Sequence, residues 1–397
     1  MVHPEVNIRL VDTLDEVLAL RPVWEQLQNH PNSDLDAYLG CNASLACVVR
    51  PYVLLLSRGA VPQAILVGRV DDTYLEAKIG YAVLHRSPVR RLTIVHAGLL
   101  GDFSEPNATA IMTALGHSLS SDKIDVLWFN SLREDSPLYA AYGRTRSFFS
   151  VDHFPETGLH WAADLSGSYA AFLNKRSSKQ RKYLRHNATK VMAAYKGALE
   201  IRCHRSAGDL DKLFEDTERI ASLTYHRALG VGFANTRDAR HRITYALERG
   251  WFRGYILYIK GSPCAFWHGL CYGRTFFLNT TGVDPAFREF GLGIFLLNKV
   301  FEELANSGEI DTVDFGLGDA HYKRQFCDEC WQEVSFYFFA HTLRGFMLNL
   351  IRTPISLADR IIRMSLEKTK LTERIKRLWR RRLQPRESGA SLTEVEQ

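Results

Sequence analysis

The chain has 397 residues, of which 46% are hydrophobic and 24% charged, a composition typical of a soluble globular protein with two or three domains. Its first residues lack the basic segment and apolar core of a secretory signal, and no uninterrupted apolar run reaches the roughly 20 residues of a membrane span. The seven cysteines are scattered, which favours a reducing compartment over a disulfide framework. These features predict a cytoplasmic protein and argue against a secreted disulfide scaffold or an integral membrane protein.

The first half of the chain alternates β-rich apolar segments with amphipathic ones. A strand is expected at 7–11, followed by one or two helices that begin at Asp12 or Thr13. A hairpin is expected at 51–70, because two apolar runs flank a turn at 58–62. The other predicted elements are a strand at 92–97, a helix at 108–119, a strand at 124–129 and a short helix at 136–142.

The second half repeats this order of elements. It contains a hairpin at 255–271, a strand at 275–283, a helix at 292–306 and a strand at 312–315. Self-similarity at this scale predicts two copies of one mixed α/β unit, each with a largely antiparallel sheet flanked by helices. The predicted domains are 1–165, 166–345 and a basic helical C-terminal tail at 346–397.

Two segments are strongly basic. A helix expected at 175–186 has aromatic residues among its charges and suits a phosphate-bearing ligand, although a solvated helix face has the same composition. The segment 368–386 holds nine Lys and Arg residues. Nucleic acid, an anionic membrane surface or an acidic partner protein would each bind such a stretch, and a solvated helix would equally account for it.

The motif Arg288-x-x-Gly291-x-Gly293 lies where the strand at 275–283 leads into the helix at 292–306. Glycine lets backbone N–H groups approach a ligand closely, and the unsatisfied N–H groups of a helix start attract phosphate or pyrophosphate. A tight turn that only joins strand to helix would explain Gly-x-Gly equally well.

The order of strand, Arg-x-x-Gly-x-Gly, helix and strand resembles motif A of the GCN5-related N-acetyltransferases (GNAT). The wider segments 224–233, 250–253, 263–267, 282–287 and 314–323 resemble the CelD-like acetyltransferases of bacterial cellulose and exopolysaccharide synthesis. The likeness spans about 166–339, and it departs from that group at Glu289-Phe290-Gly291, where the group often carries Ser-Pro-Gly. CelD-like and Fem-type transferases resemble paired acetyltransferase domains, which agrees with the internal repeat.

The resemblance implies a donor site for acetyl-CoA or another acyl-CoA and a set of catalytic residues. The expected donor-binding residues are Val283, Arg288, Phe290, Gly291, Leu292, Gly293 and Ile294. Tyr322 is the candidate acid for the leaving thiolate, and Lys323 resembles a charge-stabilising lysine of the Fem-type enzymes. Asp319 is either the base or a helix N-cap, with the cap preferred. His226 and His268 are weaker base candidates, and a core position is preferred for His268.

Acceptor-side residues are expected at Tyr225, His226 and Arg181. In the first repeat, the position of the glycine motif is held by Asp102 and Glu105, whose charges would repel a pyrophosphate, so the second repeat is expected to carry the donor. No metal is expected, because Cys327-x-x-Cys330 has no second pair at metal-binding spacing.

The prediction is a cytoplasmic acyltransferase acting on a small-molecule or saccharide acceptor, with a sugar of exopolysaccharide synthesis as one such acceptor. A peripheral membrane or synthase contact through 368–386 is also considered. The alternatives are a Fem-type transferase that uses charged tRNA, under which nucleic acid is a partner, and a non-catalytic acyl-CoA-binding or docking protein.

Overall fold

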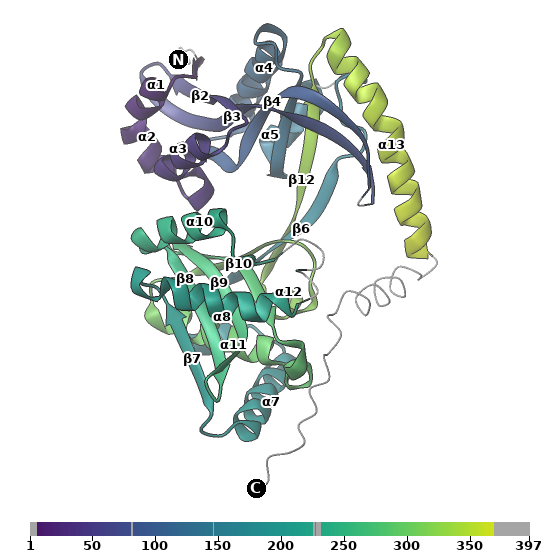
Figure 1. Ribbon diagram of the computed structural model, residues 1–397. Helices are drawn as coiled ribbons and strands as arrows, with labels where there is room; N and C mark the ends of the chain where they lie inside the picture. Colours follow the sequence, from purple (N-terminus) through teal and green to yellow (C-terminus); the bar gives the residue numbers. More distant parts are fainter. Residues whose placement is uncertain (1–5, 81, 146, 225–226, 228–231, 369–397) are drawn as a thin grey trace. The chain divides into compact units, whose positions relative to one another are not determined.

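The computed structural model describes residues 6–80, 82–145, 147–224, 227 and 232–368 (Figure 1). The chain forms two compact units that are not contiguous in sequence. Unit 1 comprises Met1–Trp161, Leu317–Ala320 and Asp328–Ser365 within the described residues, and unit 2 comprises Ala162–Gly316 and His321–Cys327. The predicted domains 1–165, 166–345 and 346–397 were each one continuous range. In the structure the segment 328–365 belongs instead to unit 1, with the N-terminal part of the chain.

Unit 1 contains a mixed sheet with helices on both faces. Its strand order is β1 (Val6–Val11), β2 (Val48–Arg58), β3 (Val61–Ile79), β4 (Ala82–Gly101), β5 (Val126–Arg133) and β12 (Glu329–Phe339). All neighbours are antiparallel except β4 and β5, which are parallel. The helices are α1 (Leu14–Ala19), α2 (Arg21–Leu27), α3 (Leu35–Ser44), α4 (Glu105–Ser121), α5 (Pro137–Thr145) and α13 (Leu343–Lys368), with the 3-10 turn η1 (Pro31–Ser33).

Alternation along the strands explains the two faces of this sheet. Leu54 and Leu66 point into the core that includes α4 and α5. Their neighbours Val53 and Ile65 point to the other face, into a second core that includes Trp24 of α2. Successive strand side chains point to opposite faces, so a continuous apolar run such as 52–56 indicates a strand covered on both sides.

Unit 2 has the same arrangement. Its strands, in order across the sheet, are β7 (Leu199–His204), β8 (Phe252–Ile259), β9 (Ser262–Tyr272), β10 (Thr275–Val283) and β11 (Thr312–Leu317). The next strand in the sheet is β6 (Glu156–Asp164), of which the part from Ala162 onward belongs to unit 2. The helices are α6 (Tyr169–Asn174), α7 (Ser178–Ala194), α8 (Leu210–Ser222), α10 (Arg237–Glu248), α11 (Leu292–Ser307) and α12 (His321–Phe326), with 3-10 turns η2 (Ala207–Asp209) and η3 (Pro285–Phe290).

The two units repeat one plan, which confirms the predicted mixed α/β tandem fold. In each, five strands follow in sequence order, a long helix joins the fourth to the fifth, and these two strands are parallel. The sixth position is filled out of sequence order. β12, encoded after α12, pairs with β5, from Phe339 opposite Val126 to Glu333 opposite Arg133. This pairing is why 328–345 belongs to unit 1 rather than to the predicted second domain.

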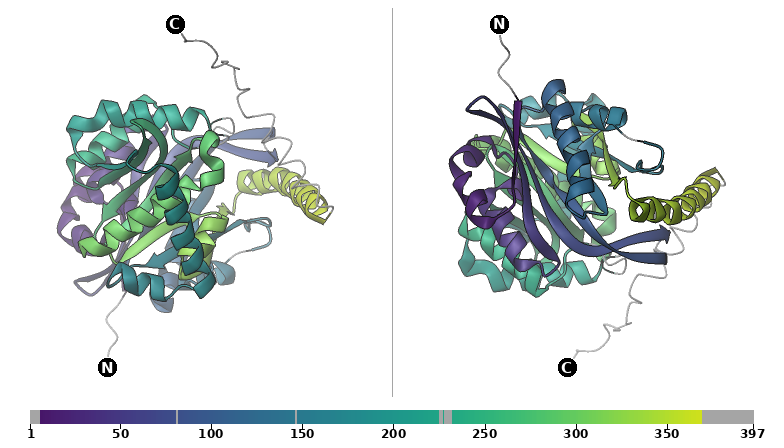
Figure 2. Two further views of the ribbon diagram at one scale, coloured as in Figure 1. Left: turned by 90° about the horizontal axis from the view of Figure 1, so that it is seen from below. Right: turned by 90° about the horizontal axis from the view of Figure 1, so that it is seen from above.

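The hairpin expected at 51–70 and the strand expected at 92–97 exist, but β3 and β4 are both longer than the prediction. β3 and β4 run on together as a two-stranded arm, in which Asp72 lies opposite Arg90 and the two are paired at 2.9 Å. Figure 2 shows this arm beside α13, and the backbone N–H of Gly80 donates to Asp359 of that helix at 2.7 Å. The charged residues of the arm hide the apolar alternation that signals a strand.

Helix α13 covers the first part of the predicted basic tail, and residues 369–397 lie outside the described residues. Its inner face packs on unit 1, where Leu348 joins a small core with Leu75 and Val89. Arg352 forms a buried ion pair with Asp152 at 2.5 Å. Among the described residues, no helix combines the length and the apolar character needed to cross a membrane.

Candidate functional site

The turn from β10 into α11 bears the glycine motif of unit 2. Asp284 begins it by accepting a hydrogen bond from the Ala286 N–H at 2.9 Å, and η3 follows. Gly291 then adopts a left-handed conformation with φ +66° and directly precedes α11. Because glycine has no side chain to cap the helix, the first N–H groups of α11 face the loop without a capping group from that residue. The loop is therefore suited to an anion.

Side chains from outside the loop bind its carbonyl groups. Asn187 of α7 donates to Phe290 O at 2.9 Å, and Lys190 donates to Glu289 O at 2.7 Å. The indole N–H of Trp267 on β9 donates to Gly293 O at 3.1 Å. These bonds hold three carbonyl groups of the loop and of the first turn of α11 from outside, and so fix the conformation of the loop.

Both glycines lie in tight places. A Cβ on Gly291 would lie 2.8 Å from Asn187 Nδ2, and a Cβ on Gly293 would lie 2.8 Å from Val283 Cγ2. A side chain at either position would force the Asn187 or Val283 side chain to shift, and at Gly291 it would also be strained by the left-handed backbone. The structure thus brings together Val283, Phe290, Gly291, Leu292, Gly293 and Ile294, six of the seven residues expected to hold the donor.

The parallel strands β10 and β11 separate next to this loop. Their pairing covers Thr275–Phe277 and Thr312–Asp314, and along the rest of both described strands they do not pair with each other. A bulge in β10 between Leu278 and Thr280 interrupts its register with β9 at the point of separation. A bulge bends its strand, so it accounts for the divergence. An extended ligand arm fits between strands that part in this way.

Tyr322 lies in the first turn of α12, next to the glycine loop at 284–293. Its ring contacts Trp267 edge-on with centroids 5.4 Å apart, and Trp267 in turn bonds Gly293. A second ring contact is made with Phe315 of β11 at 6.0 Å. Lys323 is buried, and its ammonium donates to Gly316 O at 3.0 Å, which ties α12 to the end of β11.

The other predicted residues are dispersed. Arg288 is exposed on η3, and Asp319 is exposed in the Leu317–Ala320 segment of unit 1. Arg181 donates to Arg176 O at 2.6 Å near the start of α7, six residues or about 9 Å along the helix from the Asn187 contact. Tyr225 and His226 lie outside the described residues. Three residues that contact the loop were not predicted as site residues: Asn187, Lys190 and Trp267. An asparagine within a basic helix was a usable signal for the first of them, and the structure shows that this asparagine is buried.

The equivalent turn of unit 1 is occupied by its own carboxylate. Asp102 accepts from the Ser104 N–H at 2.8 Å and from Asn107 Nδ2 at 3.0 Å, at the start of α4. Arg58 holds the oxygen of the same asparagine at 3.0 Å. A carboxylate at a helix start takes the place that a phosphate would use. This observation supports the expectation that the first repeat does not hold the donor.

His268 is a core residue of unit 2. It is 2% exposed, packs on Phe266 with ring centroids 4.8 Å apart, and its Nε2 lies 3.2 Å from Thr217 Oγ1. Burial lowers the pKa of His268 from 6.5 to about 3, with a smaller contribution from His204. The imidazole is therefore neutral, which agrees with the preferred core interpretation.

His268 should make the protein less stable as the pH falls. Between pH 6.5 and about 3 the unfolded chain binds a proton that the folded chain excludes, so the free energy of unfolding decreases as the pH is lowered. From pH 7 to pH 5 this one group should remove about 2 kcal/mol, which a His268→Gln variant should not lose. Urea unfolding of wild type and variant at pH 7 and pH 5 measures this change in the free energy of unfolding. An equal decrease in both proteins would contradict the prediction.

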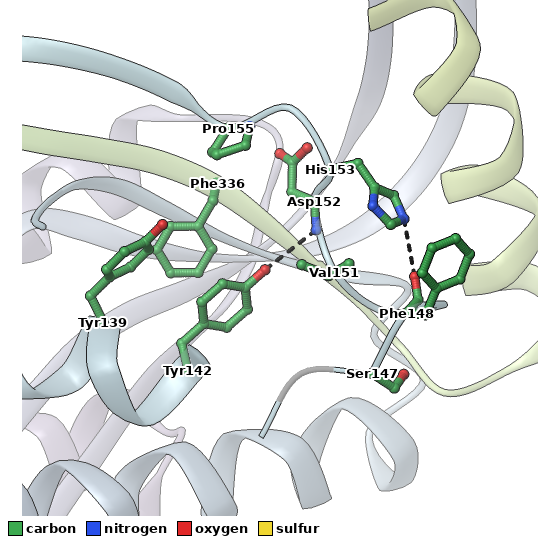
Figure 3. A pocket seen from close by; sticks show the side chains of 9 residues that line it. All are labelled: Tyr139, Tyr142, Ser147, Phe148, Val151, Asp152, His153, Pro155 and Phe336. Carbon is green, nitrogen blue, oxygen red and sulfur yellow. Dashed lines mark hydrogen bonds between the residues drawn. The ribbon is translucent and has the colours of Figure 1, made fainter. Parts of the chain in front are cut away.

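A hollow of about 370 Å³ lies wholly in unit 1. Figure 3 shows its wall, where Tyr142 accepts a hydrogen bond from the Asp152 N–H at 3.3 Å and the His153 ring lies 3.1 Å from Phe148 O. None of the predicted site residues lines it. It is therefore a feature of unit 1 and separate from the loop described above.

One family model matches the chain, and the matched region begins at α7 and ends within α12. Residues 178–324 match the acetyltransferase (GNAT) domain. The matched region contains the glycine loop, the diverging strands and Tyr322. Among curated proteins, none matches this chain.

Solved structures share the fold across both units. FemX aligns with a TM-score of 0.54 at 10% identity, covering 87% of this chain and 100% of FemX. The C-terminal domain of a putative lysylphosphatidylglycerol synthetase from Agrobacterium fabrum aligns with a TM-score of 0.50 at 11% identity, covering 86% of this chain and 96% of that domain. At these identities the similarity establishes the fold alone. The GNAT-type acyltransferase fold predicted from the sequence is thus supported, whereas the CelD-like subgroup is not.

Proposed function

We propose that unit 2 binds acyl-CoA and transfers its acyl group to an amine or hydroxyl acceptor. The observation that carries this proposal is the loop at Gly291, where an uncapped helix start lies beside two parallel strands that diverge. The pyrophosphate would bind the N–H groups of Phe290, Leu292 and Gly293, and the pantetheine arm would bond β10 near Val283. The N–H groups of Gly291 and Ile294 already donate to Arg288 O at 3.3 Å and to Gly291 O at 3.1 Å. The exposed Lys179, Lys182 and Arg185 of α7 supply positive charge for the remaining phosphate.

The chemistry requires one bond to form and one to break. The acceptor oxygen or nitrogen attacks the thioester carbonyl and loses its proton, while the carbon–sulfur bond breaks and coenzyme A leaves as a thiolate. Tyr322 donates its phenolic proton to that thiolate and regains one from solvent. Lys323 and Asp319 remain proposed contributors, as charge stabiliser and as base. The proposed acceptor is a sugar or amino sugar, on the strength of the CelD-like sequence resemblance.

Tyr322→Phe should separate catalysis from donor binding. Loss of a general acid typically lowers the turnover rate by about 100-fold or more, whereas the donor loop does not use the hydroxyl. We expect kcat to fall by that factor while the Kd for acetyl-CoA stays unchanged. The measurement is release of free thiol during a screen of amino sugars and oligosaccharides, together with isothermal titration of acetyl-CoA. A variant that turns over at the wild-type rate would remove Tyr322 from the mechanism.

A second candidate is a Fem-type transfer of an aminoacyl group from charged tRNA. The exposed basic face of α7 and the fold shared with FemX favour it. RNA binds such a face through phosphate contacts, with strong salt dependence. Acetyl-CoA binding with no tRNA binding would exclude this candidate. Binding of acetyl-CoA without turnover of any acceptor would instead favour a non-catalytic acyl-CoA-binding protein.

A further inference from the structure

Helix α13 carries a row of exposed apolar side chains along its whole described length. Leu343 is 74% exposed, Leu350 55% and Ile361 54%. The row consists of Leu343, Met347, Leu350, Pro354, Leu357, Ile361 and Met364. Their spacing alternates between four and three residues, which places them on one face of the helix. Contiguous apolar surface of this kind marks an interaction site on a soluble protein.

This row is not the face by which α13 packs on its own unit. The opposite face does that, through the buried Arg352–Asp152 pair and through Asn349, which donates to Phe149 O at 2.9 Å and to Val151 O at 3.0 Å. Asp359 on that side accepts from the Gly80 N–H. The helix is therefore fixed in place with its apolar row outward.

Aromatic and branched side chains widen the apolar surface. Ile351 and Ile362 are 40% and 42% exposed beside the row. At its N-terminal end the ring of Phe149, itself 59% exposed, contacts Phe346 with centroids 5.4 Å apart. The adjoining Phe148 is 74% exposed. The result is a broad strip rather than a narrow seam.

The charges around the strip are almost all positive. Arg344, Arg360 and Arg363 are exposed at its margins. Arg344 pairs with Asp125 at 2.8 Å and Arg363 pairs with Asp359 at 2.7 Å, so most of the positive charge comes from Arg360 and from the segment that follows the helix. In the sequence the segment 368–386 follows, which holds nine Lys and Arg residues and a single acidic one, Glu373. A helix with an apolar face, aromatic residues and basic margins binds in the interface of an anionic membrane.

We infer that the outer face of α13 docks this protein on the surface of a membrane containing anionic phospholipid. The helix lies in the plane of the interface, with the apolar row among the acyl chains and the arginines at the headgroups. A second copy of the chain fits less well. Among residues 343–365, the charged residues at the positions that flank such a row in a coiled coil are Arg344 and Arg360, and no acidic residue stands at those positions in this range to pair across the contact.

The test is flotation of the full chain with vesicles. One set is phosphatidylcholine alone, and the other contains 30% phosphatidylglycerol as a chosen probe composition. We expect binding to the anionic set to be about tenfold stronger or more, and the double variant Leu350→Glu, Ile361→Glu to lose about tenfold. The control Val61→Glu changes a side chain of similar exposure, 60%, elsewhere in unit 1 and should bind as wild type.

The double variant keeps the basic segment 368–386, so it distinguishes the α13 face from charge attraction alone. If it binds anionic vesicles as well as wild type does, the inference is wrong. It is also wrong if wild type fails to bind them, or if light scattering shows a dimer that the double variant dissociates while vesicle binding is absent. All three changed side chains are exposed, so matching thermal melts are expected.

Discussion

The Gly293→Glu variant is expected to bind acetyl-CoA at least about 100-fold more weakly than wild type. Its carboxylate would lie at the start of α11, where the proposal places the pyrophosphate, and would compete for the same N–H groups. Its Cβ would also lie 2.8 Å from Val283 Cγ2 and force the loop to shift. Loss of two charge-assisted hydrogen bonds at about 1.5–3 kcal/mol each corresponds to this factor. Isothermal titration of acetyl-CoA into variant and wild type measures the ratio of their Kd values.

The matched control for this variant is Ser104→Glu in unit 1. Ser104 directly precedes α4, as Gly291, two residues before Gly293, directly precedes α11, and the neighbouring Asp102 already places a carboxylate there. We expect Ser104→Glu to bind acetyl-CoA with wild-type affinity. A loss of affinity in this control, or retention of affinity in Gly293→Glu with an unchanged thermal melt, would contradict the assignment of the donor to unit 2.

Arg352→Met should destabilise unit 1 by about 3–5 kcal/mol, the usual cost of removing one partner from a buried ion pair. The side chains of Arg352 and Asp152 are 9% and 1% exposed. The guanidinium also stacks on Tyr337, 4.7 Å from the ring centroid. Without it, the Asp152 carboxylate would remain buried with only backbone donors such as Tyr337 N at 3.2 Å. The measurement is urea unfolding at pH 7.

Arg363→Met provides the comparison on the same helix. Arg363 is 66% exposed and pairs with Asp359 at 2.7 Å, so its loss should cost less than about 1 kcal/mol. If the two variants were equally stable, the Arg352–Asp152 pair would not be what fixes α13 to unit 1.

The sequence predicted the strand, glycine turn, helix and strand around Gly291 well because this order of elements is a local feature. The order of β10, glycine motif, α11 and β11 lies within 275–317, and apolar periodicity and turn residues mark each element. The contacts that shape the loop were not predictable in the same way. Asn187 reaches Phe290 over 103 positions of sequence, and that pairing depends on how α7 docks.

Pairing between distant strands limited the prediction of the fold. β12 and β5 lie about two hundred residues apart, and nothing in either segment specifies the other. The arm formed by β3 and β4 was missed for another reason. Its cross-strand partners include ion pairs such as Asp72 with Arg90, so charged residues replace the apolar alternation. By contrast, the apolar row from Leu343 to Met364 is visible in the sequence at helical spacing, although the prediction for 346–397 rested on its basic residues.

The measurement that tests the central claim most directly is backbone hydrogen exchange with and without saturating acetyl-CoA. If unit 2 holds the donor through backbone N–H groups, exchange should slow for amides from Val283 to Ile294 and stay unchanged at the corresponding turn of unit 1, from Leu99 to Asn107. Protection at the turn of unit 1, or no change at either turn, would contradict the account.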